Sequence, residues 1–258
     1  MLWQKLKALF GIQPAMVPKF HDEWIPMLEK WVPLYNRLPE DLRVLLHKRI
    51  AHFIATVRFE GCGDLELTEE MIVTVAAQAC LLVVHREGEP YPKLKVVYLY
   101  PSTFSSVQTR VSASGLVTEG EVHRLGESWD RGTVVLAWDS VAQGARSIGD
   151  AGNVTLHEFA HQLDHEDGPT DGAPALPSIA AYRSWARVFR ENYADFLHLT
   201  EEGEKTVLDS YGATNPAEFF AVATETFFEK PRQLHRNRPE LYEALRRYYG
   251  LDPREWFE

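Results

Sequence analysis

The sequence predicts an α+β fold in which helical regions at both ends of the chain flank a mixed sheet. Apolar residues recur at helical spacing over residues 20–85, and helical spacing returns from Asp150 onward. Between these regions lie two runs rich in β-branched and aromatic residues, Leu94–Tyr100 and Val134–Trp138. No internal repeat interrupts this order, and 258 residues are enough to bury one substantial core.

The composition is that of a globular protein. The formal net charge is −10, which disfavours a direct nucleic-acid binder because phosphate binding needs concentrated Lys and Arg. A basic cluster near the C-terminus is interpreted as a solvated helical surface beside acidic neighbours: Lys230, Arg232, Arg236, Arg238, Arg246 and Arg247. Cys62 and Cys80 are too few for a disulfide framework and suit a reducing compartment.

No segment predicts a membrane span or a secretory signal. The longest apolar run, Met71–Val84, is too short to cross a bilayer and predicts a buried helix. The first segment, Met1–Ile12, has Lys5 and Lys7 among its apolar residues and lacks a small-residue cleavage site. We therefore expect a cytoplasmic protein.

The N-terminal region is expected to be helical. In Met1–Ile12, leucines at helical spacing predict a helix that packs on the protein body. A helix that docks on a membrane surface or on a partner would show the same pattern. Leu38-Pro39-Glu40 indicates the start of a second helix, with Pro39 near its first position. Phe59–Asp64 contains glycines and predicts a break. Thr68 is then the expected N-cap of the buried helix.

The middle of the chain is expected to form the sheet. Ser105–Ser128 is polar and contains glycines, which favours a hairpin or an excursion between the two strands. Val134–Trp138 lies just upstream of the next helix. We expect it to be an edge strand, to which an extended peptide could add by backbone pairing.

The helix after Asp150 carries the strongest chemical signal. Asp150 and Asn153 are candidate N-caps, and an apolar stripe follows at Leu156, Phe159, Ala160 and Leu163. His157 and His161 lie on a different face, one turn apart, so both imidazoles can bind one ion. Glu158 is placed to accept the proton of a metal-activated water. This HExxH pattern is typical of zinc-dependent hydrolases.

A third protein ligand is needed, and the residues leave it open. His165 is the nearest candidate, but one straight helix does not easily place three side chains around one ion. Glu218 is the better candidate, in YGATNPAEFF at 211–220. The same residues describe a helix start with Asn215 as N-cap and Pro216 at the first position, and local sequence alone favours a capping role for Glu218. Glu225, seven residues later, could support a ligand or be a solvated glutamate.

Two motifs together resemble a known family. HEFAHQLD at 157–164, followed by YGATNPAEFFAV at 211–222, is similar to the Mlc titration factor A family of glucose-regulated metallopeptidases. The segments AAQACLL at 76–82 and FEGCG at 59–63 extend the resemblance over about residues 31–228. The motif pair is also similar to the catalytic domain of anthrax lethal factor. There, however, a further acid stands four residues after the ligand glutamate, where this chain has Val222.

The resemblance implies one zinc ion per chain on His157, His161 and Glu218. It implies Glu158 as general base and acid, and Tyr211 as the side chain that hydrogen-bonds the oxyanion. Without the family, Tyr211 would be interpreted as a helix-end or core tyrosine. Since Val222 replaces the acid, we expect Glu225 to take its part. The family also implies a glucose-responsive transcriptional repressor as a binding partner.

These observations together predict one zincin-like domain over residues 1–258, with a helical portion at 1–90 and a catalytic portion at 91–258. Its expected function is hydrolysis of a peptide or protein substrate, with an aminopeptidase as one form of that activity. The loop Asp167–Ser178 follows the metal helix and is expected to shape the cleft. The alternative is a protein that sequesters a regulator and whose zinc is structural or vestigial. The intact Glu158 favours the enzyme, because a structural site does not need a general base.

Overall fold

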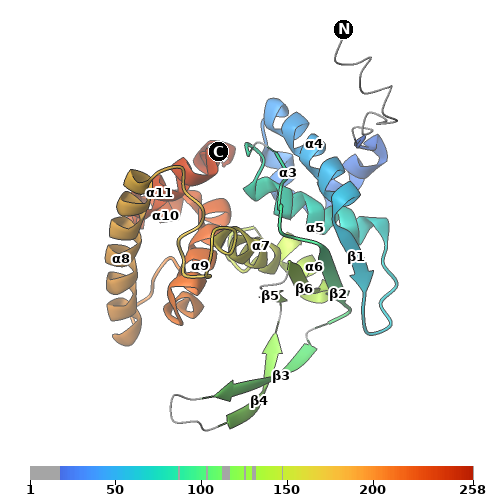
Figure 1. Cartoon of the computed structure of the whole chain (residues 1–258). Coiled ribbons are helices and arrows are strands. Elements are labelled where there is room, and N and C mark those ends of the chain that lie inside the picture. Colours follow the sequence, from blue (N-terminus) through green and yellow to red (C-terminus); the bar gives the residue numbers. More distant parts are fainter. Residues whose placement is uncertain are drawn as a thin grey trace, which may run out of the picture.

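The structure is a computed structural model that describes residues 18–257, apart from 87, 103, 112–116, 125, 130–131 and 147. Within 103–131 it describes the backbone only. The helix expected in Met1–Ile12 lies outside the described residues. The described chain is helix-rich with a small sheet (Figure 1), as the α+β prediction requires. None of its described helices combines the length and apolar character that crossing a membrane would require.

The N-terminal region forms a helical layer. Its elements are η1 (Asp22–Trp24), α2 (Ile25–Trp31), α3 (Pro33–Arg37), α4 (Glu40–Thr56) and α5 (Glu69–Leu82). Pro39 occupies the N-cap position of α4, one residue before the position expected. The Thr68 hydroxyl accepts a hydrogen bond from the Met71 amide at 3.3 Å, so the predicted cap of α5 is confirmed. Cys80 is fully buried in α5, and burial raises the pKa of its thiol.

The sheet has four strands in the order β1-β2-β6-β5, with bounds Arg58–Gly61, Val96–Tyr100, Thr133–Ala137 and Gly126–Trp129. β1, β2 and β6 are parallel, and β5 pairs antiparallel with β6, so the sheet is mixed. β1 covers the first half of the segment Phe59–Asp64 that was expected to be a break. A four-residue strand has too little pattern to be recognised alone, and its pairing partner β2 lies 35 residues further along the chain.

The prediction that Val134–Trp138 is an edge strand was wrong. Its strand, β6, lies between β2 and β5 and bonds to both. Its residues Val134–Ala137 are all buried, as expected for an interior strand with both faces covered. Trp138 leaves the strand and begins α6 (Trp138–Arg146), a helix that we did not predict.

The segment between the strands is a hairpin, which confirms one of the two expectations for it. β3 (Phe104–Val111) and β4 (Val117–Arg124) pair antiparallel in register and form a separate two-stranded sheet. In Figure 1 this hairpin extends away from the helices and the four-stranded sheet.

The helix that carries HExxH is central. α7 (Val154–Asp164) contacts α5, α6, β5 and β6 on one side and α9 on the other (Figure 1). The remaining helices are α8 (Ile179–Glu201), α9 (Pro216–Glu229), α10 (Pro231–Asn237) and α11 (Pro239–Tyr249), with short turns η2 (Ser210–Ala213) and η3 (Pro253–Trp256). Helical structure after Asp150 is therefore confirmed. The C-terminal basic residues include Arg238, which pairs with Asp195, and Arg246 and Arg247, which share Glu243.

Candidate metal centre

The predicted start and buried face of α7 are both present. The Asn153 side chain accepts a hydrogen bond from the Leu156 amide at 3.1 Å, so Asn153 rather than Asp150 is the N-cap. The apolar stripe Leu156, Phe159, Ala160 and Leu163 is buried throughout. Phe159 packs edge-on against Phe53 and Tyr91, with ring centroids 5.8 Å and 5.0 Å away. This packing sets the rotation of α7, and thereby presents His157 and His161 on its other face.

A second helix brings a carboxylate to these histidines. α9 starts as predicted, with the Asn215 side chain accepting the Glu218 amide at 3.0 Å. Asn215 thus caps the helix, while the carboxylate of Glu218 is directed at the histidine pair. Its Oε2 lies 2.9 Å from His157 Nε2 and 3.3 Å from His161 Nε2. The capping role favoured for Glu218 by local sequence therefore belongs to Asn215 and the Glu218 backbone.

The three donor atoms converge closely enough to hold one metal ion. The two Nε2 atoms are 3.2 Å apart, and one donor atom from each of His157, His161 and Glu218 lies within 4.8 Å of the others. A tetrahedral ion bound at about 2.05 Å would separate its ligands by about 3.3 Å. The observed separations of 2.9–3.3 Å fit this donor set. His165, at the C-cap of α7, is not a member of the group.

The electrostatics of the group favour positive charge between the histidines. Burial opposes ionisation of Glu218, but hydrogen bonds from His157 and His161 outweigh it and hold its pKa at about 2. Burial likewise lowers the pKa of His157, but contacts with Glu218 and Glu225 outweigh burial and raise it well above its usual value. A divalent cation would supply the positive charge that these carboxylates stabilise.

Glu225 supports His157 from behind. Its Oε1 lies 2.7 Å from His157 Nδ1, and its carboxylate also accepts the Asn153 amide. It is only 5% exposed, so it is not a solvated glutamate. A carboxylate on Nδ1 fixes the tautomer of the ring and leaves Nε2 available for a metal. Val222, where the lethal-factor pattern has an acid, is buried in the core.

A further buried carboxylate next to this site was not predicted from the sequence. Glu229, the last residue of α9, accepts a hydrogen bond from the Asn153 side-chain amide at 3.1 Å. The two residues are 76 positions apart, so no local pattern connects them. The pair ties the start of α7 to the end of α9, the two helices that carry the candidate metal group.

The remaining predicted residues lie near the group at different depths. Glu158 is buried at 6% exposure on α7, next to His157. Tyr211 lies in η2 and is 55% exposed, with its ring centroid 5.8 Å from that of His157. Tyr211 is therefore not a core tyrosine. It does lie in a short helical turn, which is close to the helix-end position that would be expected of it without the family.

The loop Asp167–Ser178 is anchored to the helices around the group. The Gly172 amide donates to Asp164 at the end of α7, and the Gly172 carbonyl accepts from the Trp185 indole on α8. Gly172 has φ +85°, and a Cβ there would lie 2.5 Å from the Pro216 carbonyl oxygen at the start of α9. Only glycine allows this close approach without strain. The loop thus packs against the first turn of the helix that carries Glu218.

Comparison with known proteins identifies relatives over most of the chain. A family described as glucose-regulated metallo-peptidase M90 matches residues 12–250. An uncharacterized protein of Synechocystis sp. is 42% identical over 231 residues, which cover 89% of this chain and 84% of the relative. A protein named Mlc titration factor A from Serratia proteamaculans is 31% identical over 91% of this chain and 92% of the relative. A protein of the same name from Cronobacter sakazakii is 30% identical over 86% of this chain and 84% of the relative. The family match includes both helices that carry the candidate metal group.

Proposed function

The chain belongs to the glucose-regulated metallo-peptidase M90 family, and on that premise we propose that it is a zinc-dependent peptidase with a zincin-like fold. The observation that carries this proposal is the convergence of His157, His161 and Glu218, from two separate helices, within 4.8 Å. Two imidazoles and a carboxylate are the protein ligands of many catalytic zinc sites, in which the fourth position is left for water or substrate. The active-site resemblance to anthrax lethal factor remains an expectation from the motifs.

In this proposal His157, His161 and Glu218 hold one zinc ion per chain. The ion would supply Lewis-acid chemistry by polarising the scissile carbonyl and lowering the pKa of the attacking water. Glu158, the buried neighbour of His157, accepts the proton from that water and returns it to the leaving amine.

Two further side chains complete the proposed site. The exposed Tyr211 beside His157 donates a hydrogen bond to the carbonyl oxygen as negative charge develops there. Its exposure is consistent with a group that meets substrate from solvent. Glu225 acts through His157: its carboxylate accepts a hydrogen bond from the Nδ1–H group and holds the ring in position.

Because β6 is an interior strand, we propose β5 instead as the strand that aligns an extended substrate. β5 is the outermost strand at its side of the described sheet, and it contacts α7. An extended peptide could therefore pair with the outer edge of β5 while its scissile bond lies near the metal group. Adding a peptide inhibitor should protect β5 amides from hydrogen exchange. Protection confined to the hairpin or to β1 would show that the peptide binds elsewhere.

The test of the proposal is Glu218→Gln with metal analysis. Glutamine keeps the backbone amide that Asn215 caps, so the variant should remain folded by circular dichroism. It removes the anionic oxygen between the histidines, so zinc affinity and hydrolysis should both fall sharply. The unmutated protein should contain about one zinc per chain, the stoichiometry of a single three-ligand site.

The matched control is His165→Ala, which removes a histidine just beyond α7 that is outside the group. It should keep the zinc content of the unmutated protein. Full zinc retention in Glu218→Gln, together with loss in His165→Ala, would move the third ligand to His165 and refute the proposed site.

The second candidate function is that of a regulator-binding protein. It is favoured by the name Mlc titration factor A, which relatives of 30–31% identity bear. A transcriptional repressor similar to Mlc is then the proposed partner, alongside or instead of a peptide substrate. Purified protein assayed on aminoacyl and endopeptide substrates, with and without a chelator, separates the two functions. Chelator-sensitive cleavage supports the peptidase, and the preferred substrate would decide whether it is an aminopeptidase. Repressor binding without cleavage supports sequestration.

A further inference from the structure

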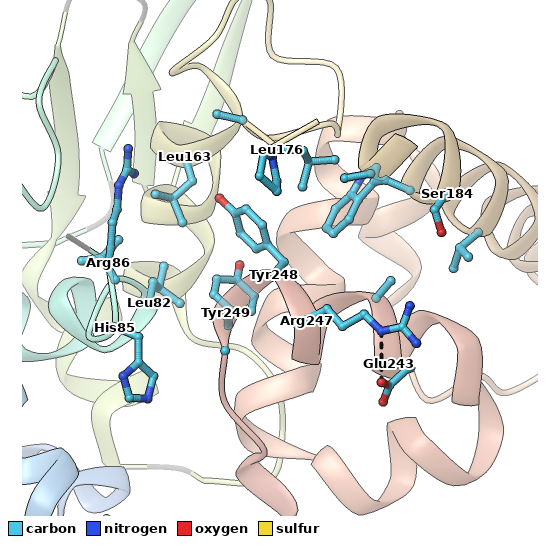
Figure 2. Close-up of a pocket in the computed structure, with 18 of the residues that line it drawn as sticks. Leu82, His85, Arg86, Leu163, Leu176, Ser184, Glu243, Arg247, Tyr248 and Tyr249 are labelled. Atoms are coloured by element: carbon cyan, nitrogen blue, oxygen red, sulfur yellow. Dashed lines mark hydrogen bonds and ion pairs between the residues drawn. The ribbon is translucent and has the colours of Figure 1, made fainter. Parts of the chain in front are cut away.

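A cavity of about 810 Å³ lies beside the C-terminal end of α7, and none of His157, His161 and Glu218 lines it. Figure 2 shows it between the ends of α5 and α7, the loop that follows α7, and the helices α8 and α11. Leu163 lines it and belongs to the apolar stripe of α7, whereas His157 and His161 lie on the other face. The cavity is therefore separate from the candidate metal group.

The walls of the cavity are mainly apolar. Side chains from five different segments contribute, and they include Leu82, Leu163, Leu176, Trp185, Val188 and Tyr248. The Trp185 and Tyr248 rings meet edge to face, with centroids 5.5 Å apart. A volume of this size and an apolar lining are typical of sites for small organic molecules. The edge and face of two neighbouring aromatic rings also favour a flat aromatic ligand.

The charged residues of the cavity are paired with one another. Arg86 makes a two-pronged contact with Glu166 at 2.7 Å and 2.5 Å. On α11, Arg247 lies 3.2 Å from Glu243. A third pair, Arg187 with Glu240, lies 3.1 Å apart at the exposed rim. A charged ligand would have to compete with one of these partners, so charge complementarity favours a neutral ligand.

One polar group points into the cavity without a protein partner. Figure 2 shows the Tyr248 ring within the cavity, with its hydroxyl directed toward the side of Leu163. Within the described part of the chain this hydroxyl has no hydrogen bond, although the neighbouring Tyr249 hydroxyl pairs with Thr224. Burial, with Tyr249 and Glu166 nearby, raises the pKa of Tyr248 well above its usual value, so the hydroxyl stays protonated. It can donate or accept one hydrogen bond.

We propose that this cavity is a second ligand site that takes a neutral, largely apolar aromatic molecule, hydrogen-bonded by the Tyr248 hydroxyl. The apolar walls bind the ring system, the paired charges select against ions, and Tyr248 orients the ligand through its one polar group. The site does not depend on the metal chemistry proposed above.

The experiment measures binding of N-phenyl-1-naphthylamine, a neutral aromatic probe whose fluorescence rises in apolar sites. Titration of the full chain should give saturable fluorescence. Ala181→Phe fills the cavity and should weaken binding at least tenfold. The matched control is Ala186→Phe, the same substitution on an exposed position of α8 outside the cavity lining, which should bind as the unmutated protein does. Tyr248→Phe should weaken binding by about threefold to tenfold, the worth of one hydrogen bond.

Melting temperatures establish that each variant is folded. If Ala181→Phe does not fold, Ala244→Phe fills the same cavity from α11 and takes its place. Absence of saturable binding to the unmutated protein would overturn the proposal. So would equal probe affinity in the unmutated protein and in a folded cavity-filling variant, because the probe would then occupy another surface. Unchanged affinity in Tyr248→Phe would remove the hydrogen bond on which the orientation of the ligand rests.

Discussion

Replacing Glu229 by glutamine is expected to remove a large part of the pH dependence of stability. Glu229 is 3% exposed at the C-terminal end of α9, where the helix carbonyls also disfavour a negative charge. Burial raises the pKa of its carboxyl to about 8. The hydrogen bonds from Asn153 and from the Ala151 amide oppose this rise, and the nearby charges of Glu225 and Asp150 reinforce it.

The sign follows from proton binding. In the unfolded chain Glu229 ionises near 4.5, whereas in the folded protein it keeps its proton up to about pH 8. The stabilising contribution of the protonated group is complete below about pH 4.5 and is lost as the pH rises toward the folded pKa. One pH unit in this window corresponds to about 1.4 kcal/mol. This one group should therefore lower the free energy of unfolding by about 2 to 3 kcal/mol between pH 5 and pH 7.

The assay is urea unfolding of chelator-treated protein at about pH 5, 6 and 7. Glutamine resembles the protonated carboxyl and can still accept from Asn153. The Glu229→Gln variant should therefore gain about 2 to 3 kcal/mol relative to the unmutated protein between pH 5 and pH 7. The control is Glu201→Gln, the exposed last residue of α8, whose difference should stay flat. The same stability difference for Glu229→Gln at all three pH values would refute a buried, protonated Glu229.

Three further outcomes follow from the site. Glu158→Gln should keep its zinc and lower kcat by at least about a hundredfold, the usual contribution of a general base; undiminished turnover would exclude this role. Tyr211→Phe should lower kcat on the order of a hundredfold with unchanged zinc content, and an unaltered kcat would leave it a structural residue. Gly172→Ala should lower the free energy of unfolding by about 1 to 3 kcal/mol, because φ is +85° and the Pro216 carbonyl blocks a Cβ. The control is Gly168→Ala in the same loop, where a Cβ would lie in open space. Equal stability of the two variants would contradict the close contact at Gly172.

Local sequence was sufficient for much of α7 and for the start of α9. Asn153 and Asn215 cap their helices as expected, because a capping hydrogen bond spans only three residues. The spacing of His157 and His161 likewise determines that both lie on one face of a helix. The alternation of helical and β-rich segments was enough to predict the α+β class, although it missed the short strand β1 and the helix α6.

Other features depended on contacts between distant parts of the chain. Whether Val134–Trp138 is an interior or an edge strand depends on β5, whose pairing is a tertiary contact. Local sequence made Glu218 a capping residue, and only the packing of α9 against α7 brings its carboxylate within 3.3 Å of both histidines. The contacts of Glu225 with His157 and of Glu229 with Asn153 join residues 68 and 76 positions apart. Short-range hydrogen bonds and helical periodicity act within one turn, so they can be predicted from the local sequence. The convergence of side chains from two helices depends instead on how the whole core packs.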